Sequence, residues 1–175
     1  MIQQPTILLA EDSEDDIILV RRAFDQAGFP YLLMTVRDGE DAISYLSGFA
    51  RFSDRARFPM PDLFLLDLRL PLRDGFEVLR WRQTQPQLKQ LPVIVLTQCD
   101  RIKDANEAYR LGAYSFLVKG TDFKDTVAFA QSVSEYLARV KNNAGWHVPP
   151  ATWPLEENMS PNTGTPTYPQ ELPIK

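Results

Sequence analysis

Short apolar runs alternate with stretches of helical periodicity through most of the chain. Several of the runs are almost uninterrupted, which is typical of strands buried on both faces. They predict five β-strands, at Thr6–Ala10, Tyr31–Val36, Leu63–Asp67, Pro92–Thr97 and Tyr114–Val118.

The segments between these runs predict helices. Ser13 with Asp16 resembles a capping box, apolar residues follow at helical spacing, and Gly28 is a plausible end. Residues 49–61 have no clean period and predict an extended loop. Five strands alternating with five helices imply an α/β fold, a doubly wound parallel sheet with helices on both faces.

Composition divides the chain in two. Seven of its 14 prolines fall from Pro149 onward, where no periodicity survives. We therefore expect a folded domain over residues 5–141 and a Pro-rich tail over 142–175, disordered or extended. Within the tail, Trp146 and Trp153 could dock onto the domain or onto a partner.

The overall balance of residues excludes several functions. The net charge of −4 gives no electrostatic basis for binding nucleic acid or an anionic membrane. One Cys and one His exclude a disulfide framework and multi-His metal sites. No apolar run reaches the length of about 18 residues that a membrane span needs, and no signal peptide is recognisable. We expect a cytoplasmic protein.

Polar residues follow four of the predicted strands, where an open α/β sheet binds its ligands. They are Glu11, Asp12, Asp67, Thr97 and Lys119. Each alone has a simpler explanation, such as a helix start or a solvated lysine. Together they predict one site, because chance alone would seldom place polar residues after four strands that end at the same edge of the sheet.

The chemistry of this set indicates phosphoryl transfer. Clustered carboxylates stay ionised together only if a cation neutralises them, and Mg²⁺ prefers oxygen ligands. An Asp in such a site can attack phosphorus and become an acyl phosphate. A lysine would stabilise the phosphoryl oxygens, and a hydroxyl could bond one of them.

With these motifs the sequence resembles the receiver domain of two-component response regulators. The resemblance rests on four segments: Ile7–Asp12, Leu65–Pro71 with Asp74-Gly75, Val95–Thr97, and Gly112–Lys119. It implies a flavodoxin-like (βα)5 fold with strand order 2-1-3-4-5. The loop at 49–61 is similar to that of stand-alone regulators paired with bacteriophytochrome-type kinases.

The resemblance also implies a role for each site residue. Asp67 would be the phosphoacceptor, and Lys119 would bind the phosphoryl group. Thr97 would turn toward that group on activation, while Phe116 rotates inward. Mg²⁺ would be bound by Asp12, Asp67 and the backbone carbonyl of Arg69, with Glu11 acting through water.

Partners follow from the same resemblance. They would be a sensor histidine kinase or a phosphotransfer protein, a downstream protein target, and a second copy of the chain bound through the last helix–strand face. About 30 residues after the receiver are too few and too acidic for a DNA-binding module. The protein would catalyse its own phosphorylation and dephosphorylation without being a turnover enzyme.

Three residues depart from the family pattern. Gly120 stands where a proline usually follows the lysine. Gln98, followed by Cys99, stands where a small residue usually follows the hydroxyl. A receiver-like interaction scaffold that does not turn over phosphate therefore remains an alternative. A haloacid-dehalogenase-type phosphatase would need an Asp at position 69, and a nucleotide or flavin binder would need a Gly-rich phosphate loop.

Overall fold

Five parallel strands form one sheet in the order β2-β1-β3-β4-β5, which confirms the predicted order. The computed structural model describes residues 4–98, 101–120 and 122–142. Cys99, Trp146, Trp153 and nearly all of the predicted tail lie outside these residues. The strands are β1 (Thr6–Ala10), β2 (Leu32–Val36), β3 (Leu63–Leu66), β4 (Val93–Thr97) and β5 (Ser115–Val118).

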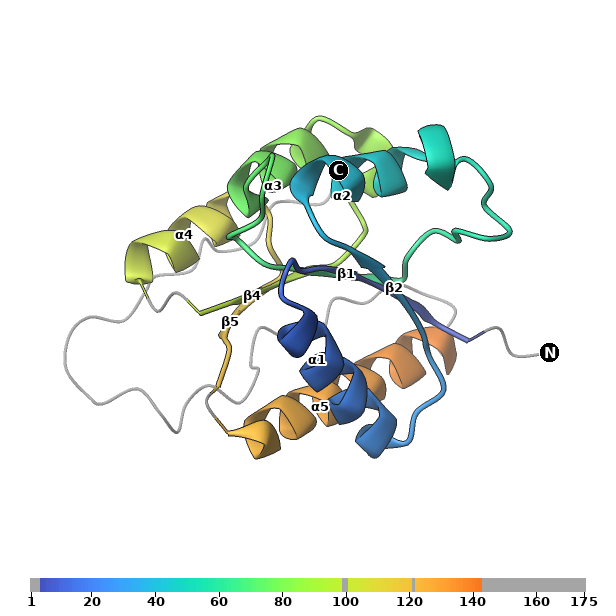
Figure 1. Ribbon diagram of the computed structural model, residues 1–175, viewed down its shortest axis with the longest axis vertical. Coiled ribbons are helices and arrows are strands. Elements are labelled where there is room, and N and C mark those ends of the chain that lie inside the picture. The colour runs from blue at the N-terminus through green and yellow to red at the C-terminus, as the bar shows by residue number, and fades with distance from the viewer. Residues whose placement is uncertain (1–3, 99–100, 121, 143–175) are drawn as a thin grey trace, which may run out of the picture.

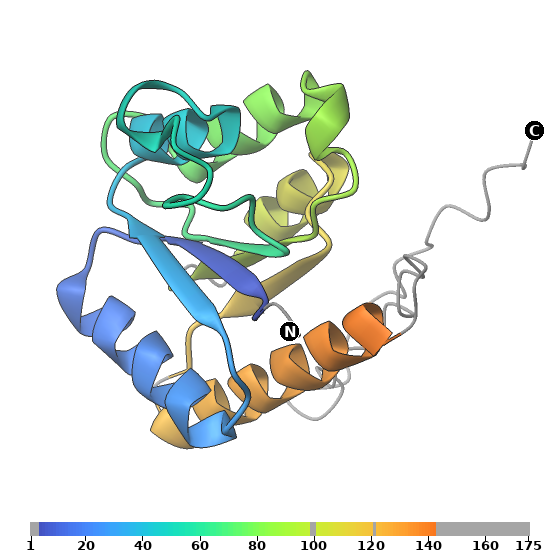
Figure 2. The ribbon, with the colours of Figure 1, turned by 90° about the vertical axis from the view of Figure 1, so that its right-hand side faces the viewer.

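Helices cover both faces of the sheet. The helices α1 and α5 lie on one face, and α2, α3 and α4 lie on the other (Figures 1 and 2). Their bounds are α1 (Glu14–Ala27), α2 (Gly39–Ser47), α3 (Gly75–Gln83), α4 (Ile102–Arg110) and α5 (Phe123–Asn142). Two 3-10 turns complete the set, η1 (Ala50–Phe52) and η2 (Pro86–Leu88). None of the helices in the described part of the chain has the length and apolarity needed to cross a membrane.

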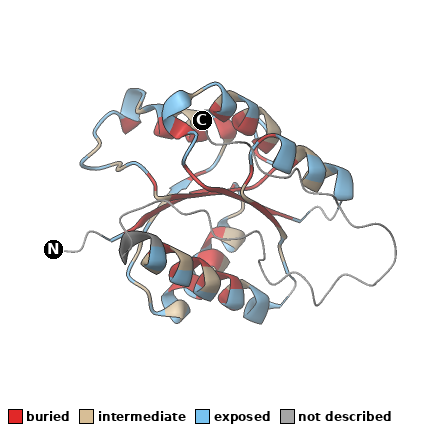
Figure 3. Cartoon of the chain, turned by 180° about the vertical axis from the view of Figure 1, so that it is seen from behind, coloured by how far each residue is buried: buried red, intermediate tan, exposed pale blue. Residues whose placement is uncertain are grey.

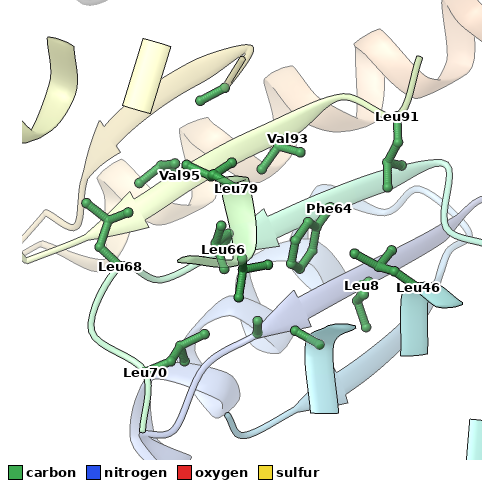
Figure 4. Packing of buried hydrophobic residues seen from close by; sticks show 14 of the residues in the cluster. Leu8, Leu46, Phe64, Leu66, Leu68, Leu70, Leu79, Leu91, Val93 and Val95 are labelled. Carbon is green, nitrogen blue, oxygen red and sulfur yellow. The ribbon is translucent and has the colours of Figure 1, made fainter. Parts of the chain in front are cut away.

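The sheet separates two apolar clusters. Along β1, Leu8 packs toward the α2–α4 face, whereas Ile7 and Leu9 pack toward α1 and α5. Every residue of β1, β3 and β4 is buried, which explains why these strands have no polar alternation (Figure 3). Figure 4 shows the first cluster, in which leucines of β1, β3 and the helices meet around Phe64. Because both faces are covered, the backbone at the strand ends is held firmly.

The start of α1 differs from the predicted capping box. Ser13 does cap the helix, since its Oγ accepts the N–H of Asp16 at 3.3 Å. The N–H of Ser13, however, donates to Glu11 Oε1 at 3.2 Å. The reciprocal half of the predicted box is therefore wrong, and the Asp16 carboxylate is available for another partner.

Residues 49–61 contain the short η1 turn and no strand or α-helix, as predicted for a loop, but the segment packs on α2 and does not extend away from the domain. The rings of Phe52 and Phe58 lie 5.1 Å apart and pack on Tyr45 of α2, with centroids 5.2 and 6.1 Å from it. Arg55 donates to the carbonyls of Tyr45 at 2.8 Å and Leu46 at 3.0 Å, at the end of α2. Arg55 therefore adds donors to carbonyl groups in the last turn of α2, beside the Gly48 N–H, which also reaches the Tyr45 carbonyl.

A buried arginine joins three parts of the α2–α4 face. Arg82, on α3, is 6% exposed and donates to the carbonyls of Leu91 at 2.6 Å and Gly112 at 3.3 Å. It also donates to the Lys89 carbonyl at 3.3 Å. It thereby links α3 to the segments that enter β4 and β5.

We predict that Arg82→Met lowers the free energy of unfolding by about 2–4 kcal/mol, because it leaves these carbonyls without their donor. Urea denaturation measures the change. Arg80→Met is the matched control, since Arg80 lies on the same helix and is exposed. It should change stability by less than about 0.5 kcal/mol. Equal effects from the two variants would contradict the assigned role of Arg82.

The division into a domain over 5–141 and a tail stays a prediction. A chain cut after Asn142, the last residue of α5, should keep its helical circular dichroism signal. Its thermal midpoint should stay within about 4 °C of the full chain, the shift that 1 kcal/mol gives in a domain of this size. A larger loss would show that the tail, with Trp146 and Trp153, stabilises the domain.

Candidate functional site

The carboxyl ends of three strands bring charged side chains into contact. Glu11 follows β1, Asp67 follows β3 and Lys119 follows β5. The Nζ atom of Lys119 lies 2.5 Å from Glu11 Oε2 and 2.7 Å from Asp67 Oδ2. The side chains of Glu11 and Asp67 are 2% and 8% exposed, so these contacts are largely shielded from water.

Backbone contacts fix the Asp67 carboxylate. The Asp67 N–H donates to the carbonyl of Ala10 at 3.0 Å, which continues the pairing of β1 with β3 past the strand end. Asp67 Oδ1 accepts the N–H of Arg69 at 3.0 Å. One carboxylate oxygen is therefore held by the backbone and the other by Lys119.

Gly75 allows α3 to begin close to this carboxylate. Its N–H donates to the Leu68 carbonyl at 2.9 Å, and a Cβ placed on it would lie 2.5 Å from the Asp67 carbonyl oxygen. Such an approach is closer than any side chain tolerates. The Asp74-Gly75 pair thus has two roles, because Asp74 caps α3 in a complete capping box.

Burial and charge shift the pKa values of the cluster. Burial raises the pKa of Glu11 to about 7, and the charge of Asp67 adds to this, while Lys119 opposes it. Burial alone would lower the pKa of Lys119. Its hydrogen bonds to Asp16, Asp67 and Glu11 outweigh burial and raise that pKa above its usual value. Lys119 is therefore a cation at every pH at which the protein would act.

Asp16 belongs to this cluster although the sequence did not single it out. Its Oδ2 lies 2.8 Å from Lys119 Nζ, and its side chain is 20% exposed. An acidic residue three positions after Ser13 is explained by a capping box or by the helix dipole, so nothing in the pattern marked Asp16 as a site residue. The only available signal was that its helix begins three residues after Glu11.

The remaining predicted site residues lie around this cluster. Thr97 is fully buried at the end of β4, and its carbonyl accepts the Lys119 N–H at 2.8 Å. Phe116 is 5% exposed and belongs to the core on the α2–α4 face. Asp12 is exposed, and among the described residues its side chain makes none of the hydrogen bonds or ion pairs of the cluster.

The carboxylate oxygens at this site are of the type that binds a hard divalent cation. The charge of Asp67 raises the pKa of the buried Glu11 carboxyl, a repulsion that a cation would relieve, and oxygen is the ligand that Mg²⁺ prefers. In the present arrangement, no three Asp, Glu, His or Cys residues of the described ranges are grouped as a metal centre. The ammonium of Lys119 contacts the carboxylates and offsets part of their charge.

Comparison with known proteins agrees with this fold. The family model of the response regulator receiver domain matches residues 7–131. The response regulator Rcp1 of Synechocystis sp. is 35% identical over 130 residues, which cover 74% of this chain and 86% of Rcp1. The crystal structure of its Mn(2+)-bound form has a TM-score of 0.68 at 34% identity, covering 76% of this chain and 94% of that one.

Two further solved structures are similar. The phosphorylated cyanobacterial phytochrome response regulator RcpA has a TM-score of 0.70 at 32% identity, covering 77% of this chain and 94% of that one. The response regulator RPA3017, from red light signalling of R. palustris, has a TM-score of 0.71 at 35% identity, covering 75% and 92%. With its strand order and its carboxylate–lysine cluster, this chain belongs to the response regulator receiver domain family of two-component systems.

Proposed function

We propose that this chain accepts a phosphoryl group on Asp67 from a sensor histidine kinase or a phosphotransfer protein. The observation that carries the proposal is the Asp67 carboxylate, held between the Arg69 N–H and the Lys119 ammonium at the carboxyl edge of the sheet. Receiver domains in general are phosphoacceptor signalling modules rather than turnover enzymes.

The transfer is a displacement at phosphorus. A carboxylate oxygen of Asp67 attacks the phosphorus of a phosphohistidine on the donor protein, and an O–P bond forms as the P–N bond breaks. The electron pair of the broken bond stays on the histidine nitrogen, which leaves as neutral imidazole because the other ring nitrogen carries a proton. Lys119 stabilises the charge on the phosphoryl oxygens.

Receiver domains generally bind Mg²⁺, and the Rcp1 structure described above holds Mn²⁺. In this chain Asp12, Asp67 and the Arg69 carbonyl would hold Mg²⁺, with Glu11 acting through water. Such an ion supplies positive charge to the phosphoryl oxygens.

We further propose that Thr97 reports the modification by bonding a phosphoryl oxygen. The Phe116 side chain, which packs beneath α4, would change its position in response. Phe116 is 5% exposed and packs in the core on the α2–α4 face, which supports a role for its ring in the switch. The signal would leave through α4, β5 and α5.

The surface of these elements suits a protein partner. Ile102 and Tyr109 of α4 are 70% and 47% exposed, and Val118 of β5 is 41% exposed. This face would bind a downstream protein or a second copy of the chain. A cytoplasmic location stays a prediction from the composition.

We predict that the wild-type chain, incubated with Mg²⁺ and a phosphorylated kinase or acetyl phosphate, gains one phosphoryl group that hydroxylamine removes. Asp67→Asn should show only background labelling, because an amide oxygen does not form the acyl phosphate. Intact-protein mass spectrometry measures both. Asp54→Asn, an exposed site in the 49–61 segment, should be labelled like wild type.

Two results would count against the proposal. Equal labelling of Asp67→Asn would place the phosphoryl group on another residue. A wild-type chain that stays unlabelled with every donor would favour the interaction scaffold.

We predict that Lys119→Met lowers the free energy of unfolding by about 2–4 kcal/mol in the presence of EDTA, because three carboxylates lose their cation. Added Mg²⁺ should restore more stability in this variant than in wild type, since the ion would then be the only countercharge. Urea denaturation with and without Mg²⁺ measures the change.

Lys124→Met, an exposed site on α5, is the control and should leave stability nearly unchanged. A Lys119→Met chain as stable as wild type in EDTA would show that the ammonium does not neutralise the cluster.

A further inference from the structure

Asp16 makes the one contact of the Lys119 ammonium that comes from a helix. The other two acceptors, Glu11 and Asp67, directly follow strands of the sheet. Asp16 occupies the third position of α1, and the Ser13 cap fixes its backbone N–H at 3.3 Å. The N–H of Ser13 donates to Glu11, so the Asp16 carboxylate is not used to cap its own helix.

The three contacts use all the donors that a lysine has. An ammonium carries three N–H groups, and here each of the three carboxylates lies within 2.5–2.8 Å of the nitrogen. The two strand-end carboxylates are also the groups proposed to bind or approach the divalent cation. Asp16 is the one acceptor that is not proposed to bind this cation, so its carboxylate stays available to Lys119.

Cation binding would therefore leave the lysine dependent on Asp16. A divalent ion that draws on Glu11 and Asp67 competes for two of the three acceptors and also repels the ammonium. Lys119 is a point charge on a flexible four-carbon stem, and without a remaining partner it would turn toward water. An anchored carboxylate on α1 prevents this.

We propose that Asp16 is a positioning residue that keeps Lys119 beside Asp67 once the divalent cation is bound. The proposal rests on the proposed function of Asp67 and Lys119. It assigns to α1 a part in the reaction, because the first turn of this helix fixes where the phosphoryl-binding lysine sits. Asp16 itself touches neither the acceptor nor the proposed phosphoryl group.

The test compares Asp16→Asn with Asp15→Asn and Asp16→Glu. Asp15 is the matched control, because it lies one residue earlier in the same helical turn, carries the same charge and is exposed. Nuclear magnetic resonance of the Lys119 ammonium in selectively ¹⁵N-lysine-labelled protein reports its protection from solvent exchange, with Mg²⁺ and without it. This readout does not require phosphorylation.

In wild type and in Asp15→Asn, the Lys119 ammonium signal should persist when Mg²⁺ is added. In Asp16→Asn it should persist without Mg²⁺ and disappear with it. At saturating Mg²⁺ the rate of phosphorylation by acetyl phosphate should fall about tenfold in Asp16→Asn, the value of one charged hydrogen bond. Asp16→Glu should restore both the signal and most of the rate.

An ammonium signal that survives Mg²⁺ in Asp16→Asn would overturn the proposal, as would equal loss of rate in Asp15→Asn. Failure of the proposed function gives a different result. In that case the wild-type chain is not phosphorylated at all, while the dependence of the Lys119 signal on Asp16 is still measured.

Discussion

The ammonium of Lys119, surrounded by three carboxylates, is the interaction on which the functional edge of this protein depends. Glu11, Asp16 and Asp67 are all at most one-fifth exposed, and their mutual repulsion is not screened by water as it would be on an open surface. A single cation placed between them connects the ends of β1, β3 and β5 with the start of α1. The same charge stabilises the fold at this edge and is available to a phosphoryl group, so stability and function draw on one group.

The sheet makes this arrangement possible because its central strands are buried on both faces. β1 is paired on both sides, with β2 and β3, and β3 is paired with β1 and β4, so the residues after β1 and β3 keep their positions. Close backbone approaches then bring the surrounding helices near. Gly75 lets α3 begin against the Asp67 carbonyl, and Gly39 lets α2 begin against the backbone of Arg73. Side chains at either position would force the acceptor loop outward.

Much of the fold and part of the site could be predicted from the sequence, for reasons that differ between residues. The apolar runs of β1, β3 and β4 predicted the buried strands. Glu11, Asp67 and Lys119 could be predicted because they follow β1, β3 and β5, and parallel strands end at one edge of the sheet. Asp16 could not be found this way. Its contact depends on the direction of one side chain in a first helical turn, where acidic residues are ordinary. The packed 49–61 segment was missed because its aromatic residues contact α2 without a regular spacing.

The segment formed by residues 49–61 lies at the opposite end of β3 from Asp67, so changes in its sequence occur away from the reaction. It packs on the end of α2 through Tyr45, Phe52 and Arg55, and it leads into the amino end of β3, whereas Asp67 follows the carboxyl end. Its aromatic rings join the apolar cluster on the α2–α4 face. Insertions or deletions within it would change the outline of the molecule without moving the acceptor carboxylate. Natural or engineered relatives could therefore acquire new binding specificity there while retaining the same chemistry.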